Sequence, residues 1–407
     1  MTSDPVTISV RGQVAGPAGT SRLFAAGSAD FASHQAAFGP LPAMDRAPLI
    51  DELLRSGLDG RGGAGFAAWQ KLASVPVDGR RPVIIANGAE GEPLSQKDAA
   101  LLHSAPHLVI DGTLIAGQSL GAKELHLYAG AAQLAPVARA LKERGEARIR
   151  LHEAPDTFIS GEGTAVVSAI SGGLPIPRDR IGRLTNSGLN GRPTLVHNVE
   201  TLGHLALISR FGSAWFRSVG TGSAPGTRLI TLSGNTAGPR VYEIPTGVRL
   251  TEILVSTGVD VLSVRAALVG GYHGTWLAAD KLDAPFSKEG LAPVGARTGA
   301  GIIMMLGSGS CGLAATADIL TYLAGQSARQ CGPCTNGLPA VSSLFARLAY
   351  GDTKGKLPQE ISRLAALVTG RGSCAHPDGT ARLALSALMA FGSDVEAHLH
   401  GRCEALR

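Results

Sequence analysis

One glycine-rich stretch has the residue types and spacing to hold an anionic ligand. Residues 60–66 read GRGGAGF, whose first, third and sixth positions fit G-x-G-x-x-G, and Lys71 follows shortly after. Glycines at this spacing let a backbone approach a phosphate closely, usually where a helix begins. A dinucleotide fingerprint normally follows a strand, whereas residues 49–57 read as a short helix that ends at a glycine. A glycine-rich turn without a ligand is therefore the alternative.

A second stretch favours the ligand-binding interpretation. Residues 82–86 read PVIIA, a short apolar run typical of a strand, and residues 87–98 continue as the polar loop NGAEGEPLSQKD. Ligands of open α/β sheets bind at the carboxyl ends of strands. This loop is expected at such an end, so the two stretches together indicate a binding site.

These two stretches also carry a resemblance to a known family. GRGGAGF with its lysine, followed by N-x-x-E-G-E-P and K-D, resembles the NADH-binding flavoprotein subunit of respiratory complex I and its relatives in soluble NAD-linked hydrogenases and formate dehydrogenases. Residues 157–165, TFISGEGTA, resemble the family's Y-I-C-G-E-E-T-A, and residues 193–202, PTLVHNVETL, resemble P-T-x-V-N-N-V-E-T-L. The resemblance extends from about residue 46 to near the end of the chain, with the motifs in the family's order.

The resemblance implies an NADH dehydrogenase-type oxidoreductase that binds FMN. Backbone N–H groups of the glycine-rich loop, with Lys71 and Arg61, would hold the FMN phosphate, and Asn87 and Glu90 would contact the polar edge of the isoalloxazine. Glu90 and Glu92 are the implied catalytic residues. The implied cofactor-binding residues are Gly60, Arg61, Gly62, Gly65, Phe66, Lys71, Asn87, Glu90, Glu162, His197, Asn198 and Thr201.

The sequence departs from the family mainly around the expected nicotinamide pocket. Ala89 replaces an aspartate, Gly163 replaces the second glutamate of the third motif, and residues 178–185 lack the family's proline pair and adenine-stacking aromatic ring. Arg180 or Arg183 could still hold an anionic nucleotide. FMN binding is therefore better supported than NADH oxidation. The alternatives are an FMN and cluster bridge or scaffold that takes electrons from a ferredoxin-like partner, and a non-redox binding module.

The chain has five cysteines, an odd number, and all lie after residue 310; they suit metal ligation better than a disulfide framework. In the family, four cysteines hold one 4Fe–4S cluster; Cys331, Cys334 and Cys374 match three of them, and Ala328 occupies the first position. The fourth ligand is then a non-cysteine residue, with His376 nearest in sequence, or the site has an open iron, a three-iron cluster or no cluster. Cys311 is a poor substitute, because a helix of on the order of 20 Å separates it from the others.

The spacing Cys331-Gly-Pro-Cys334 also allows a redox dithiol, whose first cysteine has a lowered pKa at a helix N-terminus. That interpretation requires a preceding strand. A helix is expected before Cys331 instead, so the dithiol and unreactive cysteines remain the alternatives to a cluster.

Composition describes a globular protein with scattered charge. The net charge of +5 comes from basic residues without a cluster, so we expect no nucleic-acid binding. The N-terminal residues lack a signal peptide pattern, and the longest apolar run, residues 302–306, is too short to span a bilayer. We expect a cytoplasmic protein without membrane insertion, which meets a membrane only through a complex and passes electrons to a ferredoxin-like or other redox subunit.

The element pattern predicts a multi-domain α/β protein. After an N-terminal segment (residues 1–45, with a strand at 6–10), we expect an FMN-binding parallel-sheet α/β domain (46–215), a β-grasp domain resembling soluble-ligand-binding modules (216–295) and an iron–sulfur-binding helical bundle (296–407). The β-grasp domain has either a ligand or only a structural role. In the first domain, strands are expected at residues 82–86, 124–128 and 148–152, and helices at 107–120, 131–144, 162–170 and 195–211.

Overall fold

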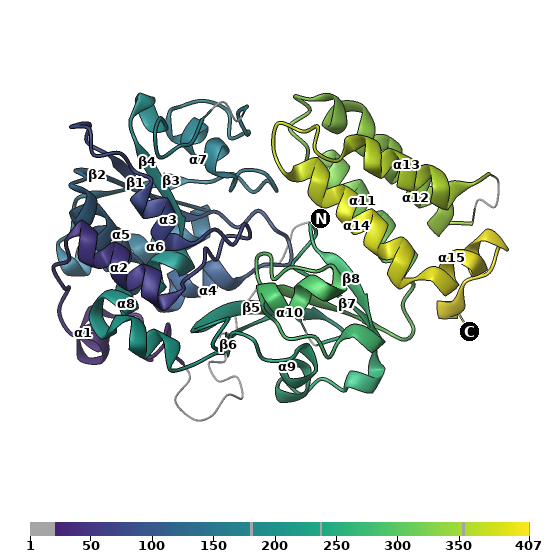
Figure 1. Ribbon diagram of the computed structural model, residues 1–407, viewed down its shortest axis with the longest axis horizontal. Coiled ribbons are helices and arrows are strands. Elements are labelled where there is room, and N and C mark those ends of the chain that lie inside the picture. Colours follow the sequence, from purple (N-terminus) through teal and green to yellow (C-terminus); the bar gives the residue numbers. More distant parts are fainter. Residues whose placement is uncertain (1–20, 180–181, 237, 352–354, 407) are drawn as a thin grey trace.

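The computed structural model describes the chain except residues 1–20, 180–181, 237, 352–354 and 407. It contains a parallel four-stranded sheet, a five-stranded sheet and a group of C-terminal helices, in this order along the chain (Figure 1). The predicted fold class is confirmed. The strand expected at residues 6–10 lies outside the described residues.

The first sheet has the strand order β3-β2-β1-β4, and each neighbouring pair is parallel. Its strands are β1 (Val83–Gly88), β2 (Glu124–Ala129), β3 (Ile149–Glu153) and β4 (Thr194–Asn198). A parallel sheet is buried on both faces, which explains why the central strand β1 is an almost continuous apolar run.

Helices cover both faces of this sheet. Side chains of β1, β2 and β4 share one core with α2, α5, α6 and α8, and the alternate side chains of the strands pack against α7. Helix α5 is buried along nearly its whole length and ends at Gly121, which adopts a left-handed backbone. The helices are α1 (Phe31–Phe38), α2 (Arg46–Ser56), α3 (Ala68–Ala73), α4 (Lys97–Ser104), α5 (Pro106–Leu120), α6 (Ala131–Arg144), α7 (Gly163–Ile170) and α8 (Val199–Arg217).

The helix predicted for residues 195–211 is wrong at its beginning. The first residues of this range form β4, and α8 begins only at Val199. A short apolar run fits a buried strand and a buried helix equally well, and here pairing with β1 decides the outcome. The correction matters because β4 brings the fourth sequence motif beside the loop that follows β1.

The second sheet is mixed, with the order β6-β5-β9-β7-β8. Strand β9 lies between two antiparallel pairs, runs parallel to β5 and antiparallel to β7, and one face of the sheet packs on α9. This arrangement fits the β-grasp expectation. The elements are β5 (Thr227–Gly234), β6 (Arg240–Pro245), α9 (Leu250–Ser256), β7 (Val264–Val269), β8 (Thr275–Ala278), α10 (Lys288–Leu291) and β9 (Ile302–Gly307).

The C-terminal helices share a core that also includes side chains of the second sheet, among them Trp276, whose ring lies 5.2 Å from that of Phe391. Residues 376–399 form two helices, because the chain leaves helical geometry at Phe391. These helices are α11 (Gly312–Gly325), α12 (Leu338–Ala349), α13 (Leu357–Val368), α14 (His376–Ala390) and α15 (Gly392–Leu399).

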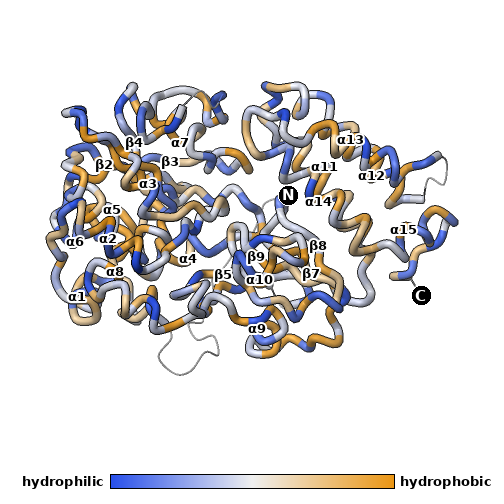
Figure 2. The backbone as a smooth tube through the Cα atoms, in the orientation of Figure 1, coloured by the Kyte–Doolittle hydropathy of each residue, from blue (hydrophilic) through white to orange (hydrophobic). Residues whose placement is uncertain are grey.

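Hydrophobic segments follow the strands of both sheets and the helices that pack on them (Figure 2). None of the described helices is by itself long and apolar enough to cross a membrane. Helices α4 and α5 together are long and apolar enough, but they meet at a bend of 94°. Most of their residues belong to the buried core.

Candidate functional site

The candidate site lies at the carboxyl edge of the first sheet, where β1 and β4 end side by side. Asn87 of β1 is paired with Asn198 of β4, and β2 and β3 lie on the other side of β1. The chain therefore changes its direction across the sheet between β1 and β4, and open α/β sheets bind ligands at the carboxyl ends of strands at such a point. Asn198 Nδ2 donates to Asn87 O at 3.3 Å, so the two strand ends are fixed to each other.

The glycine-rich loop closes on itself and lies against this edge. The N–H of Gly60 donates to Phe66 O at 2.8 Å, and a β-bridge joins the flanking residues Asp59 and Ala67. A Cβ atom on Gly62 would lie 3.2 Å from Asn198 Cβ, so the loop backbone is in close contact with the end of β4. Gly65 has φ +62°, a backbone conformation that favours glycine.

Arg61 has a different position from the one its phosphate-binding role implies. Its guanidinium pairs with Asp59 and donates to Thr227 O at 3.1 Å, and the side chain is only 2% exposed. Its backbone N–H donates to Thr201 Oγ1 at 2.9 Å. Arg61 therefore connects the loop to α8 and β5 rather than directing its charge to the loop's glycines.

Lys71 and His197 form a desolvated pair beside the loop. Lys71 Nζ donates to Val196 O on β4, and burial lowers the pKa of Lys71 to about 8, with Glu162 opposing the shift. His197 is buried, and burial followed by the charge of Lys71 holds its pKa well below the ordinary value. Within the described chain, His197 Nε2 has no hydrogen-bond partner. A buried polar atom left unpaired costs about 1–3 kcal/mol, so this arrangement favours a ligand with polar atoms.

A buried charge network lies directly behind the strand ends. Lys97 Nζ is 2.7 Å from Asp98 Oδ1 and 2.9 Å from Glu200 Oε2, and Asn198 Nδ2 donates to Asp98 Oδ2 at 2.6 Å. Burial opposes the charge of Lys97, but Asp98 and Glu200 raise its pKa above the ordinary value. Burial raises the pKa of Asp98 to about 7, and Lys97 limits that rise. The network fixes Asn198 at the start of α8, where its side chain accepts from Glu200 N at 3.0 Å.

The two glutamates expected to act in catalysis are both engaged by backbone groups. Glu90 accepts from the N–H groups of Asp98 and Ala99, each at 3.1 Å, and thus holds the start of α4. Glu92 accepts from Tyr272 N at 2.8 Å, in the connection between β7 and β8. Burial raises the pKa of Glu92 to about 8, although the bond from Tyr272 opposes the shift.

The loop of the third motif, residues 157–162, packs tightly against the loop after β1. Asn87 Nδ2 donates to Gly161 O at 2.9 Å, and a Cβ on Gly91 would come within 2.4 Å of Thr157 O. Glu162 accepts from Thr164 N at 2.7 Å and caps the start of α7. These contacts bring the first three motifs together at the same edge as β4.

The same loop reaches the C-terminal helices through Phe158. Its N–H donates to Gln326 Oε1 at 3.1 Å, and its ring lies 4.7 Å from His273 and 5.5 Å from His376. Gln326 directly follows α11 and precedes Cys331 in the chain. Phe158 therefore connects the sheet edge with the cysteine-containing segment.

The surroundings of the expected nucleotide pocket are partly open. Phe66 is 49% exposed and Arg183 is exposed, whereas Arg180 lies outside the described residues. A Cβ on Gly163 would lie 3.3 Å from Leu184 Cδ1, so an apolar side chain borders the position of the missing glutamate.

The structure brings Cys331, Cys334 and Cys374 close to one another. The backbone N–H groups of Cys334 and Ser373 donate hydrogen bonds to Cys331. Burial opposes ionisation of the Cys331 thiol, but these hydrogen bonds hold its pKa below the ordinary value. Burial, followed by the neighbouring thiols of Cys331 and Cys374, raises the pKa of Cys334 to about 12. The loops around residues 331 and 374 therefore form one thiol-rich site.

His376, the nearest alternative ligand in sequence, is engaged elsewhere. Its Nε2 donates to Leu323 O at 2.8 Å, which leaves Nδ1 as an acceptor for His273 Nε2 at 3.0 Å. Both ring nitrogens thus have partners. Asp179 is exposed and lines a cavity of about 480 Å³ together with Gln330, and its negative charge tends to raise the pKa of the Cys331 thiol.

Sequence reasoning missed the buried network as a part of the site. Lys97 and Asp98 belong to the second motif and Glu200 to the fourth. Their mutual contact cannot be read from the sequence, because it depends on α4 and α8 meeting at the sheet edge. A buried charge within an otherwise apolar helix, as at Glu200, is the signal that could have identified it, because such groups are almost always paired.

Comparison with known proteins identifies two family models in the chain. Residues 53–206 match the Nuo51 FMN-binding domain, and residues 306–398 match the NADH-ubiquinone oxidoreductase-F iron-sulfur binding region. The first range contains the glycine-rich loop and all four strands of the first sheet, and the second contains Cys331, Cys334 and Cys374.

Curated relatives cover nearly the full length. The F subunit of the Streptomyces coelicolor NADH-quinone oxidoreductase is 30% identical over 392 residues, an alignment that includes 91% of this chain and 87% of the relative. The F 2 subunit of the Rhizobium meliloti NADH-quinone oxidoreductase is 27% identical over 375 residues, with 87% and 89% coverage.

A solved structure has the same fold. The air-oxidised NAD+-reducing NiFe hydrogenase superposes on 87% of this chain with a TM-score of 0.79 and 27% identity. This chain spans 63% of the length of that hydrogenase chain.

Proposed function

The chain belongs to the family of NADH-quinone oxidoreductase F subunits, and we propose that it oxidises NADH at bound FMN and passes electrons through an iron–sulfur cluster to a partner redox protein. The observation that carries this proposal is the desolvated Lys71–His197 pair beside the glycine-rich loop. FMN, when bound, accepts two electrons from a nicotinamide and releases them one at a time to a cluster.

The residues at the sheet edge fit a flavin phosphate. A phosphate group would provide Lys71 with a charged acceptor in addition to the Val196 carbonyl, and the unpartnered Nε2 of His197 provides a further polar contact. The glycine-rich loop allows the close backbone approach that an anion requires. We propose that Asn87, Asn198 and the loops around them hold the rest of the flavin.

Replacing Lys71 with alanine should weaken FMN binding roughly 10- to 150-fold, because a hydrogen bond to a charged group contributes about 1.5–3 kcal/mol. The dissociation constant is measured by flavin fluorescence on the protein freed of FMN. Lys142→Ala is the matched control, because Lys142 is exposed on α6. Undiminished FMN affinity in Lys71→Ala would remove Lys71 from the phosphate site.

The thiol-rich site fits a cluster with three cysteine ligands. Thiolates of one cluster bind different iron atoms, so they stand farther apart than the ligands of a single ion, and among the described residues these three cysteines do not form a compact single-ion group. We propose that a non-cysteine ligand completes the cluster, and Asp179, whose charge acts on Cys331, is the candidate. In this proposal Phe158 and Gln326 fix the distance between the flavin loop and the cluster by holding the two segments together.

The protein's own residues then have defined tasks. The network of Lys97, Asp98 and Glu200 holds Asn198 in place, and Glu92, whose pKa burial raises, ties the second sheet to the site. We propose Glu90 and Glu92 as the residues that face NADH. A ferredoxin-like or other redox subunit receives the electrons.

We place this reaction in the cytoplasm, because cluster ligation requires reduced thiolates and the cytoplasm keeps thiols reduced. A second candidate function is an FMN and cluster bridge that does not oxidise NADH. Gly163 favours it, because the family's second glutamate is missing and Leu184 borders its position. Anaerobic addition of NADH to the FMN-loaded protein separates the two: loss of flavin absorbance supports NADH oxidation, and an unchanged flavin supports the bridge.

A further inference from the structure

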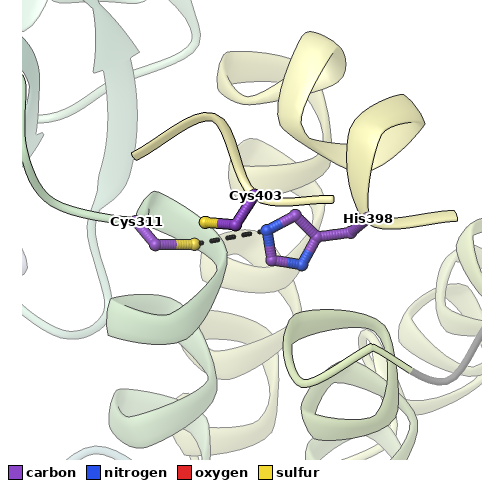
Figure 3. Close-up of side chains that lie close together, drawn as sticks. All are labelled: Cys311, His398 and Cys403. Carbon is purple, nitrogen blue, oxygen red and sulfur yellow. Dashed lines mark hydrogen bonds between the residues drawn. The ribbon is translucent and has the colours of Figure 1, made fainter. Parts of the chain in front are cut away.

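Three potential metal ligands converge at the end of the bundle far from the predicted cluster cysteines. Cys311 immediately precedes α11, His398 lies in α15, and Cys403 follows α15 (Figure 3). Their ligand atoms, Sγ, Nε2 and Sγ, all lie within 4.8 Å of one another. The side chains point toward one another from three separate segments (Figure 3).

The distance between Cys311 and His398 matches that between two ligands of a tetrahedral zinc ion. Cys311 Sγ and His398 Nε2 are 3.6 Å apart. Zinc bonds of about 2.3 Å to sulfur and about 2.0–2.1 Å to nitrogen, at tetrahedral angles, place the two ligand atoms about 3.6 Å apart. An ion could therefore bind both atoms without moving either side chain.

Backbone hydrogen bonds orient two of the three ligands, His398 and Cys311. His398 is buried, and its Nδ1 donates to Leu348 O at 3.2 Å, which leaves the lone pair of Nε2 directed at the sulfurs. Metal-binding histidines usually hold their second nitrogen in this way. Cys311 Sγ accepts from Ala314 N at 3.4 Å, which fixes the sulfur at the start of α11.

We propose that Cys311, His398 and Cys403 bind Zn²⁺. Two thiolates and one imidazole are a ligand set that zinc prefers, and thiol protons are released when the ion binds. Both cysteines are half-buried rather than enclosed, so the fourth position is open to water. The site is separate from the cluster site, since α11 begins beside Cys311 and ends before Gln326. Zinc fixes the segment after α15 to the start of α11.

The test is zinc binding by the full-length reduced protein, measured by metal analysis after equilibration with Zn²⁺ and a competing chelator. Wild type and Cys331→Ala, in which only the cluster site is altered, should each hold about one zinc. Cys403→Ser and His398→Ala should bind zinc roughly 100-fold or more weakly, because loss of an outer-shell partner alone costs about 10–100-fold. Co²⁺ in place of zinc should give thiolate charge-transfer absorbance that Cys403→Ser lacks.

Three results would overturn the proposal. The first is no zinc uptake by the reduced wild type. The second is equal zinc affinity in wild type and in Cys403→Ser, with circular dichroism showing both folded. The third is a mass lighter by two hydrogens in the freshly purified protein, with Cys311 and Cys403 joined in one peptide, since a disulfide would occupy both thiols.

Discussion

Cys331→Ala should lose the iron–sulfur cluster completely and keep FMN. The site has three cysteines where a 4Fe–4S cluster normally has four, so removal of one leaves two thiolates and no stable cluster. Iron should fall from roughly three to four per chain to a background level, with loss of the reduced cluster's electron paramagnetic resonance signal. The flavin absorbance should remain, because the residues proposed to hold FMN lie at the sheet edge.

Two further variants make this expectation specific. Cys311→Ala should retain full iron, because Cys311 lies at the other end of α11 and contacts His398 instead. Ala328→Cys restores a thiolate at the position where the family has one and should increase the yield of the four-iron form. Unchanged iron in Cys331→Ala would show that the iron is held elsewhere.

Glu200→Ala should destabilise the protein by about 3–5 kcal/mol, the usual effect of removing one partner from a buried ion pair. Glu200 Oε2 lies 2.9 Å from Lys97 Nζ, and Oε1 accepts from Leu229 N at 2.7 Å. Burial opposes ionisation, but Lys97 holds the pKa of Glu200 well below its ordinary value, so the carboxylate is charged in the folded protein. Alanine would leave Lys97 with Asp98 alone and leave the N–H of Leu229 without this acceptor.

Urea unfolding followed by tryptophan fluorescence measures this effect, because Trp69 and Trp215 pack against the core of the first sheet. Glu200→Gln keeps the shape and an acceptor for Leu229, so it should recover part of the loss. Glu289→Ala is the control, since Glu289 is exposed on α10. A midpoint for Glu200→Ala equal to that of Glu289→Ala would contradict the assigned role.

Elements with strong local signals could be predicted from the sequence. The bounds of α6 agree with the prediction at residues 131–144, because its apolar face is periodic and Gly145 ends it in a left-handed conformation. Strand β1 also ends close to where the sequence places the start of the polar loop. The confirmed fold class and family rest on such local features and on the order of the motifs.

Features that depend on tertiary contacts could not be predicted. The residues of β4 fit a helix as well as a strand, and only their pairing with β1 decides between the two. Strand β9 is a short apolar run that is equally ambiguous until it pairs with β5 and β7. The guanidinium of Arg61 binds Thr227 across 166 positions of sequence. Cys311 and His398 are 87 positions apart, so no spacing rule could join them.

The most direct test of the proposed function is an anaerobic visible spectrum of the FMN-loaded protein during addition of NADH. NADH oxidation predicts that the flavin band disappears at about one NADH per flavin, because each NADH delivers two electrons. A flavin that stays oxidised in excess NADH, yet is bleached by dithionite, would contradict NADH oxidation. Electrons would then have to enter from another donor, such as a ferredoxin-like protein.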